Sequence, residues 1–315
     1  MAALVPTAAF DVLGCGCVAV DDLLTVAAYP PADTKAPVVR RERQCGGLVG
    51  TALVAAARLG ARCAYVATLG TDDLSEFALG RLRAEGVDVG HVARAAAAGP
   101  VRSVIVVGAD TGSRTIFPDV TGLAAGGPER LDEPLVRSTR VLFIDHFWAA
   151  RKLPAARFAR AAGIPVVADF EDDSEPGFAA LLEQVDHLVL SAEMARRLTG
   201  ARPDAAAAAL SGVGRRLVAV TDGAAGVWYR AEDAAGHLPA FPVRAVDTTG
   251  CGDVFHGAYA AGLAGGLGVV ERLRLAAAAA ALKATRPGGQ LGIPSRTDVE
   301  RFLAAHGHDP PASRS

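Results

Sequence analysis

The alternation of strand-like and helix-like segments after residue 62 limits this chain to one fold class. Short apolar runs rich in Val, Leu and Ala are typical of strands, and longer segments with helical spacing follow them. The expected strands are 63–69, 141–144, 165–168, 185–190 and 216–221, and the expected helices are 72–85, 151–162 and 191–198. Strands that alternate with helices form a parallel sheet covered on both faces. The sequence therefore predicts an α/β fold with a doubly wound, mostly parallel sheet.

Polar side chains follow several of the predicted strands. Asp145, Asp169 and Ser191 each come directly after an apolar run. Asp21 comes just after the first strand, which we expect over residues 10–20. Ligands of such sheets bind beyond the carboxyl ends of the strands. We therefore expect these four side chains near a ligand site.

One stretch near the end of the chain, residues 246–259, has the composition of an anion-binding turn. It joins a strand-like run, 241–245, to an Ala-rich run, 254–265, that we expect to be a helix. Its glycines allow a tight turn and let a ligand approach the backbone. The amides of residues 250–252 then lie at a helix start, where they have no intrahelical partners and the helix dipole is positive. The stretch therefore predicts an anion site.

Asp253 follows this turn directly. A carboxylate at a helix start is ordinarily a cap or a first-turn residue. Here Asp253 would share an anion hole formed by Gly250, Cys251 and Gly252. That combination suits phosphoryl transfer, because the amides stabilise the charge of the moving group while the carboxylate accepts a proton from the attacking hydroxyl. Asp253 is thus the candidate catalytic base.

The run from Asp247 to Phe255, Asp-Thr-Thr-Gly-Cys-Gly-Asp-Val-Phe, resembles the signature of the ribokinase-like, or PfkB, carbohydrate kinases, Asp-Thr-x-Gly-Ala-Gly-Asp-x-Phe. Cys251 stands where the family usually has Ala. A second run, Ala-Leu-Lys-Ala-Thr-Arg-Pro-Gly-Gly at 281–289, resembles the family's closing segment near the adenine. Together the two runs are most similar to the ketohexokinase and sulfofructose-kinase-like branch. The resemblance extends from Val12 to about Phe302.

The resemblance implies one ribokinase-like kinase domain over residues 9–305. Strands in the ranges 21–45 and 99–118 would leave the main sheet and form a small lid over the sugar. Because exposed lid strands often pair across a dimer, we expect a homodimer formed through the lid. Residues 306–315 are polar with two prolines, and we expect this tail to be disordered.

The resemblance also assigns a sugar site. Asp21 matches the family's substrate-binding Asp, whose carboxylate can accept hydrogen bonds from two sugar hydroxyls. Gly46 and Gly47 match a Gly-Gly pair that opens a helix and contacts the sugar. The Asn that usually follows is absent, because Val49 and Gly50 stand there. An ordinary turn at Asp21 and a plain helix start after Gly47 are the alternative interpretations.

For ATP, the family pattern points to strand ends and to the closing segment. The implied nucleotide-binding residues are Ser191, Thr221, Gly223, Gly226 and Gly288. Thr221-x-Gly223-x-x-Gly226 resembles a turn that contacts nucleotide phosphates through its amides. The resemblance therefore implies ATP as the phosphate donor.

The metal pattern is altered. Many members carry Asn-x-x-Glu where this chain has Ser191-Ala-Glu193-Met194. Glu193, one residue from the usual Glu, and Asp169 are the remaining candidates for Mg²⁺, which commonly keeps several waters and few protein ligands. Asp247 and Thr249 match positions that bind a monovalent cation, K⁺, in some members. These residues are the candidate metal ligands.

The hypothesis that follows is an ATP-dependent kinase that phosphorylates a hydroxyl of a small sugar, a ketose. Three alternatives stay open: a nucleoside kinase of the same fold, a catalytically silent sugar-binding protein, and a dinucleotide-binding oxidoreductase. The last rests on Gly14-x-Gly16-x-x-Ala19, a match to GxGxxG/A that requires a helix to begin at the glycines.

Composition excludes several other classes. The net charge of −2 argues against nucleic acid as the main partner. We expect no membrane partner, because no uninterrupted apolar run is long enough for a spanning helix, and the first residues lack the basic start of a signal peptide. The five cysteines form no CxxC pair, which favours small buried residues in a reducing compartment. We therefore expect a cytoplasmic enzyme.

Overall fold

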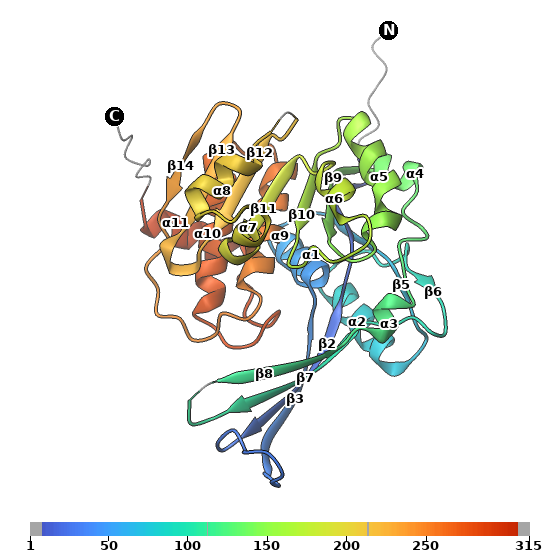
Figure 1. Cartoon of the computed structure of the whole chain (residues 1–315), viewed down its shortest axis with the longest axis vertical. Helices are drawn as coiled ribbons and strands as arrows, with labels where there is room; N and C mark the ends of the chain where they lie inside the picture. Colours follow the sequence, from blue (N-terminus) through green and yellow to red (C-terminus); the bar gives the residue numbers. More distant parts are fainter. Residues whose placement is uncertain (1–7, 112, 213, 308–315) are drawn as a thin grey trace.

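The computed structural model describes residues 8–111, 113–212 and 214–307. Its main sheet has eight strands in the order β14-β13-β12-β11-β10-β9-β1-β4 (Figure 1). Their bounds, in that order, are Ala235–Leu238, Val227–Ala231, Leu217–Thr221, His187–Ser191, Val166–Asp169, Thr139–Asp145, Phe10–Cys15 and Cys63–Val66. The six strands from β12 to β4 are parallel, and β13 and β14 are antiparallel. This mostly parallel sheet confirms the predicted fold class.

Helices cover both faces of this sheet (Figure 1). On one face α1 and α9 pack against β1 and β9, with α10 and α11 outside them. On the other face α5, α7 and α8 pack against β9–β12, together with α4 and α6. The strands are buried on both sides, and two apolar clusters fill the two interfaces. The bounds of these helices are Leu48–Arg58 (α1), Glu133–Arg137 (α4), Ala149–Ala161 (α5), Phe178–Leu182 (α6), Ala192–Thr199 (α7), Pro203–Leu210 (α8), Cys251–Ala264 (α9), Val269–Ala284 (α10) and Arg296–Ala305 (α11).

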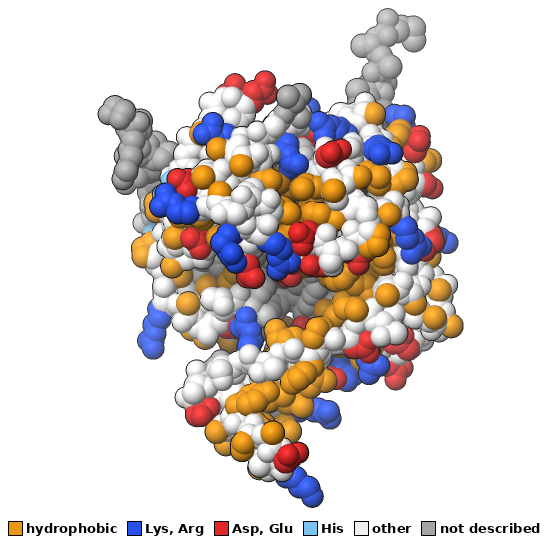
Figure 2. Space-filling model, viewed as in Figure 1, with side chains coloured by type: hydrophobic (Ala, Val, Ile, Leu, Met, Phe, Trp, Pro, Cys, Tyr) orange, Lys and Arg blue, Asp and Glu red, His pale blue; other side chains and the backbone are white. Residues whose placement is uncertain are grey.

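A second sheet of four strands projects from the body in the order β3-β2-β7-β8 (Figures 1 and 2). Its strands are Val38–Gly46 (β3), Ala19–Val26 (β2), Val101–Gly108 (β7) and Arg114–Asp119 (β8). We call this sheet the lid. Only β2 and β7 pair in parallel, and the other two pairs are antiparallel.

Smaller elements connect the lid with the body. They are β5 (Thr68–Leu69), α2 (Asp73–Ala84), β6 (Ala93–Arg94), α3 (Thr121–Ala124) and the 3₁₀ turn η1 (Gly223–Ala225). Among the helices of the described ranges, none combines the length and the apolar character that a membrane crossing requires.

Four local predictions were wrong. The strand expected over residues 63–69 is divided, because β4 ends at Val66 in the main sheet and β5 pairs with β6 in a separate sheet. The strand expected over residues 10–20 ends at Cys15, and the chain turns at Gly16–Val18 before β2 begins. Residues 241–245, expected to be strand-like, form no strand, because β14 already ends at Leu238. The helix expected from residue 254 begins at Cys251, since the glycine turn itself supplies the first helical turn. The predicted tail disorder falls mostly on residues 308–315, which lie outside the described part of the chain.

Candidate active site

The glycine turn starts α9 as the sequence predicts. Gly250 is the N-cap residue with φ +75°, a left-handed conformation that a glycine adopts without strain. The amide of Cys251 donates to the carbonyl oxygen of Thr248 at 3.2 Å. The predicted anion hole therefore loses one of its three amides to the turn. The amides of Gly250 and Gly252 have no backbone acceptor within the described residues, apart from any intrahelical bond, and remain available for an anion.

Asp253 lies in the first turn of α9 and lines a cavity of about 600 Å³ between the lid and the body. Burial is the main cause that raises the pKa of this carboxyl well above its usual range. The negative charges of Asp169, Glu171 and Asp21 raise it further. A carboxyl group with a raised pKa holds a proton more strongly, which suits a group that must accept one.

The same cavity brings together both halves of the predicted site. From the lid side come Asp21, Gly46 and Gly47, and from the body come Asp247, Thr249, Gly250 and Gly288. Asp21 lies within β2 and not beyond a strand of the main sheet, because the chain changes sheets at Gly16–Val18. Burial raises the pKa of Asp21 as well.

The Gly46–Gly47 turn requires its glycines. Gly47 has φ +87°, and a Cβ atom there would lie 2.6 Å from the Cα atom of Val18. A Cβ atom at Gly46 would lie 2.7 Å from Oδ2 of Asp21. The turn therefore packs against the start of β2 and opens α1, as the sequence predicts.

Asp247 organises the turn that precedes α9. Its Oδ1 accepts the amide of Thr249 at 2.9 Å, and its Oδ2 accepts the amide of Gly288 at 2.8 Å. Burial opposes ionisation of Asp247, but these hydrogen bonds and the charge of Lys283 outweigh it and lower the pKa. The amide of Gly289 donates to Oε1 of Gln44 at 3.2 Å. The closing segment is thus joined both to the glycine turn and to the base of the lid.

A buried histidine holds α9 against the sheet. His256 Nδ1 lies 2.8 Å from the carbonyl oxygen of Gly252, and its Nε2 lies 3.0 Å from that of Val189. Nδ1 also lies 3.2 Å from Oδ2 of Asp169. His256 therefore joins the first turn of α9 to the carboxyl end of β10 and to the middle of β11. It positions the site and does not reach the cavity.

This chain matches the model of the pfkB family carbohydrate kinases over residues 16–296, which include the lid, the glycine turn and the closing segment. The chain belongs to the PfkB family. As a PfkB carbohydrate kinase it is a phosphotransferase that uses an alcohol group as acceptor.

Relatives agree with this assignment. The chain is 29% identical to an ATP-dependent ribose-1-phosphate kinase of Halopiger xanaduensis, over 93% of this chain and 98% of the relative. It is 27% identical to fructokinase-1 of Oryza sativa subsp. japonica, over 88% of this chain and 91% of the relative. Among solved structures, ribokinase from Thermotoga maritima superposes with a TM-score of 0.80 at 25% identity, covering 94% of this chain and 99% of the other.

The dinucleotide interpretation of Gly14-x-Gly16 does not hold in this PfkB kinase. Gly14 lies within β1, and after Gly16 the chain continues into β2, so no helix begins at these glycines. Gly16 instead makes room for a side chain, because a Cβ atom there would lie 2.2 Å from Oδ2 of Asp145.

The predicted nucleotide residues lie at neighbouring strand ends. Ser191 and Thr221 are opposite each other in the register of β11 and β12. Gly223 lies in η1, and Gly226, with φ +97°, leads into β13. These four residues do not line the cavity that holds Asp253, whereas Gly288 does. Ser191 also caps α7, accepting the amide of Met194 at 3.1 Å.

Asp145 and Glu193 differ in their access to solvent and therefore to a ligand. Asp145 ends β9 as predicted, but it is fully buried and pairs with Lys152 at 2.7 Å. It is therefore closed to ligands. Glu193 is exposed, with an ion-pair distance of 3.9 Å to Arg197. Within the described ranges no group of three His, Cys, Asp or Glu side chains is arranged to hold a metal.

Sequence reasoning did not select several residues of the cavity. Gln44, Arg40 and Glu42 reach it from β3, beside Arg114 from β8. Arg114 lies 4.0 Å from the carboxylate of Asp247. Their only sequence signal was their place in the predicted lid strands, because polar residues on a lid strand do not show which face they occupy.

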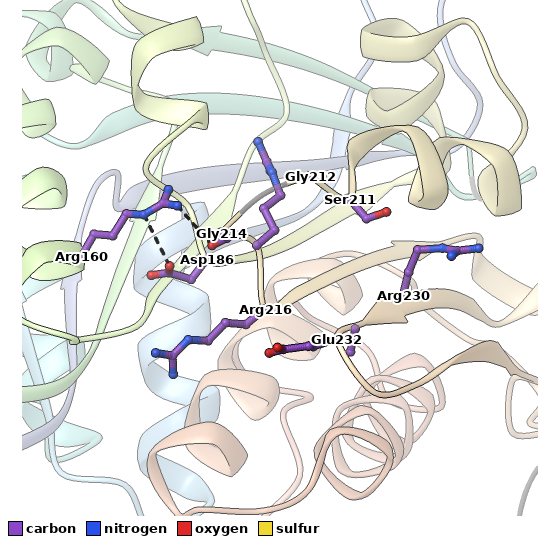
Figure 3. A pocket seen from close by; sticks show the side chains of 10 residues that line it. Arg160, Asp186, Ser211, Gly212, Gly214, Arg216, Arg230 and Glu232 are labelled. Atoms are coloured by element: carbon purple, nitrogen blue, oxygen red, sulfur yellow. Dashed lines mark hydrogen bonds and ion pairs between the residues drawn. The ribbon is translucent and has the colours of Figure 1, made fainter.

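A second cavity, of about 610 Å³, lies at the opposite end of the main sheet (Figure 3). Its arginines, which include Arg160, Arg216 and Arg230, extend in different directions in Figure 3. Arg160 is engaged with Asp186, whose Oδ1 lies 4.0 Å from its Nε. This cavity contains none of the motif residues, so the candidate active site is the cavity at Asp253.

Proposed function

We propose that this carbohydrate kinase transfers the γ-phosphate of ATP to a hydroxyl of a ketose. One observation carries the proposal: Asp253 and the open start of α9 share a cavity with Asp21 and the Gly46–Gly47 turn. Asp253 accepts the proton of the attacking hydroxyl. Gly250 and Gly252 stabilise the charge of the transferred phosphoryl group through their amides. Cys251 keeps these amides in place through its bond to Thr248.

The sugar lies on the lid side of this cavity. Asp21 accepts hydrogen bonds from sugar hydroxyls, and the Gly46–Gly47 turn offers its backbone at close range. ATP lies on the body side, with its phosphates near Ser191, Thr221, Gly223 and Gly226 and its base near Gly288. The name of the Halopiger relative, an ATP-dependent kinase, supports ATP as the donor.

Mg²⁺ would accompany ATP and neutralise phosphate charge in this site. Asp169, which is buried, and Glu171 lie close enough to Asp253 to raise the pKa of its carboxyl group, so they fit this requirement better than Glu193. Oδ2 of Asp169 accepts no hydrogen bond from the described residues. Glu193 stays a weaker candidate. Changing Asp169 to Asn should weaken Mg²⁺ dependence of ADP binding; unchanged dependence would contradict its role.

An ADP-release assay over a panel of sugars and nucleosides, with Mg²⁺ present, tests the function. We expect turnover with a ketose such as fructose, consistent with the fructokinase relative. Turnover with adenosine alone would replace the sugar proposal with a nucleoside kinase. ADP binding without turnover of any compound in the panel would contradict the ketose assignment.

A sugar that carries an anionic group is a second candidate substrate. Arg40 and Arg114 line the cavity from the lid. Arg40 is paired with Glu42 at 2.5 Å, whereas Arg114 lies 4.0 Å from the carboxylate of Asp247, so Arg114 is the more available cation. Ribose 1-phosphate therefore belongs in the panel. A strong preference for it over ribose and fructose would favour this candidate.

The pH dependence of the reaction follows from the pKa of Asp253. Because burial and nearby carboxylates raise that pKa, the base becomes available only at a pH above the usual range of Asp, about 3.9. We expect kcat/KM for the sugar to fall as the pH decreases through the raised pKa. A pH profile of kcat/KM measures this directly. A rate that stays constant down to the usual pKa of Asp, about 3.9, would contradict Asp253 as an unassisted base.

We further propose a homodimer formed through the lid, in a single-domain cytoplasmic enzyme. Apolar side chains gather on the exposed lid, as Figure 2 shows. Those with at least two fifths of their surface exposed are Val38, Val39, Val104, Ile116 and Phe117. Pairing would cover them and the strand edges. Sedimentation at the mass of one chain would contradict the dimer.

A further inference from the structure

Lys283 is a fully buried lysine whose partners are carbonyl oxygens. It lies in the last turn of α10, and its side chain is closed to solvent. Its Nζ donates to the carbonyl oxygen of Asp247 at 2.9 Å and reaches that of Arg286 at 3.4 Å. The other buried lysine, Lys152, pairs instead with a carboxylate. The surroundings of Lys283 are thus those of a cation held by carbonyl groups.

Its two partners belong to the two segments that meet beside the anion hole. Asp247 opens the glycine turn, and Arg286 lies in the part of the closing segment that follows the end of α10. Their contact is reinforced by the bond from the amide of Gly288 to Oδ2 of Asp247. The position is also favourable for a positive charge, because the dipole of α10 is negative at the C-terminal end of this helix.

The chain makes room for this lysine. A Cβ atom at Gly292 would lie 2.9 Å from Cδ of Lys283, so a larger residue at 292 would displace the lysine side chain.

The sequence matched Asp247 and Thr249 to a monovalent-cation site. The carbonyl of Asp247, however, already receives the ammonium group, and the amide of Thr249 donates to the Asp247 carboxylate. A second cation at the same carbonyls would be repelled by the first. The residues present therefore do not fit K⁺.

We propose that the ammonium group of Lys283 takes the place of a monovalent cation in this kinase. It joins the glycine turn to the closing segment and so keeps the anion hole in shape without K⁺. The proposal rests on the proposed function in one respect, namely that this turn binds the phosphates of the nucleotide.

The unmodified protein provides the first test. We compare the protein in potassium chloride and in tetramethylammonium chloride at equal ionic strength. The measured quantities are the ADP affinity, kcat/KM for the best sugar of the panel, and the thermal unfolding midpoint. We expect each kinetic and binding constant to differ by less than about twofold. An ADP affinity or a kcat/KM that is about tenfold or more higher in potassium chloride than in tetramethylammonium chloride would overturn the proposal. A change of this size corresponds to one lost charge-assisted hydrogen bond.

Two variants provide the second test. Lys283→Ala removes the ammonium group and leaves space, and in tetramethylammonium chloride it should bind ADP at least about tenfold more weakly. Added K⁺ or methylammonium should restore most of this loss and raise the unfolding midpoint of this variant alone. Lys283→Met fills the space without a charge and should not be rescued. Lys35→Ala, at an exposed lid position, is the matched control and should behave as the wild type.

The outcomes separate this proposal from the proposed function. If the wild type binds no ADP, the proposed function fails. The unfolding midpoint of Lys283→Ala, with and without K⁺ or methylammonium, then still tests whether Lys283 replaces a cation. The proposal is overturned if Lys283→Ala binds ADP with the affinity of the wild type. It is also overturned if K⁺ and methylammonium leave the unfolding midpoint of this variant unchanged. If this variant does not fold, the ion dependence of the wild type decides.

Discussion

Changing Asp253 to Asn should reduce kcat by about 10²- to 10⁴-fold, the usual contribution of a general base. Asn has nearly the same shape but does not accept the proton of the hydroxyl. ATP affinity should change little, because the amides of Gly250 and Gly252 and the strand ends of β11 and β12 are untouched. Single-turnover rates and calorimetric titration with a non-hydrolysable ATP analogue measure the two effects.

Cys251→Ala is the matched control for this variant. Its side chain is half-buried, and the contribution of Cys251 to the turn comes from its backbone amide, which Ala retains. We expect nearly wild-type turnover. Unchanged turnover in Asp253→Asn would refute the assigned base, and a large loss in Cys251→Ala would show that the thiol has a role in the reaction.

Changing Lys152 to Met should destabilise the fold by about 3–5 kcal/mol, the cost of leaving one charge of a buried pair uncompensated. Lys152 and Asp145 are both fully buried. Asp145 also accepts the amide of Cys17 at 2.6 Å, at the point where the chain passes from the main sheet into the lid. Urea unfolding at neutral pH measures the loss of stability.

The double variant Asp145→Asn/Lys152→Met distinguishes the lost charge balance from lost packing. We expect it to be more stable than Lys152→Met alone, because no charge is left unpaired. Lys35→Met, at an exposed position, should stay within about 0.5 kcal/mol of the wild type. Equal destabilisation of the single and the double variant would contradict the importance of the pair.

Much of the local structure followed from the sequence. The parallel sheet was predictable, because short apolar runs alternate with capped helices, as at Asp72, which caps α2, and Ser191, which caps α7. The anion turn was predictable as well, because Gly250 and Gly252 before an Ala-rich helix leave few alternatives for the backbone. The error at residues 10–20 has a physical cause: an apolar run does not show where a strand leaves one sheet for another.

In the candidate site too, some residues could be predicted from the sequence and some contacts could not. Asp253, Asp21 and the Gly46–Gly47 turn were identified from their motifs, since each motif depends on a local backbone shape. The pairing of Asp145 with Lys152 and the burial of Asp169 beside His256 were not predicted. Charges far apart in sequence give no local signal of contact, because only the packing of the sheet and its helices brings them together.

The sequence by itself thus determined the fold class, the family and the glycine turn at the start of α9, since these depend on short-range backbone preferences and on the periodicity of apolar residues. Only the tertiary structure decided which polar groups are free for ligands. It closed Asp145 to solvent, left Arg114 facing the cavity, and placed the ammonium group of Lys283 on the carbonyl of Asp247. The reason is physical: desolvation and charge pairing depend on distances between segments, which the order of residues along the chain does not contain.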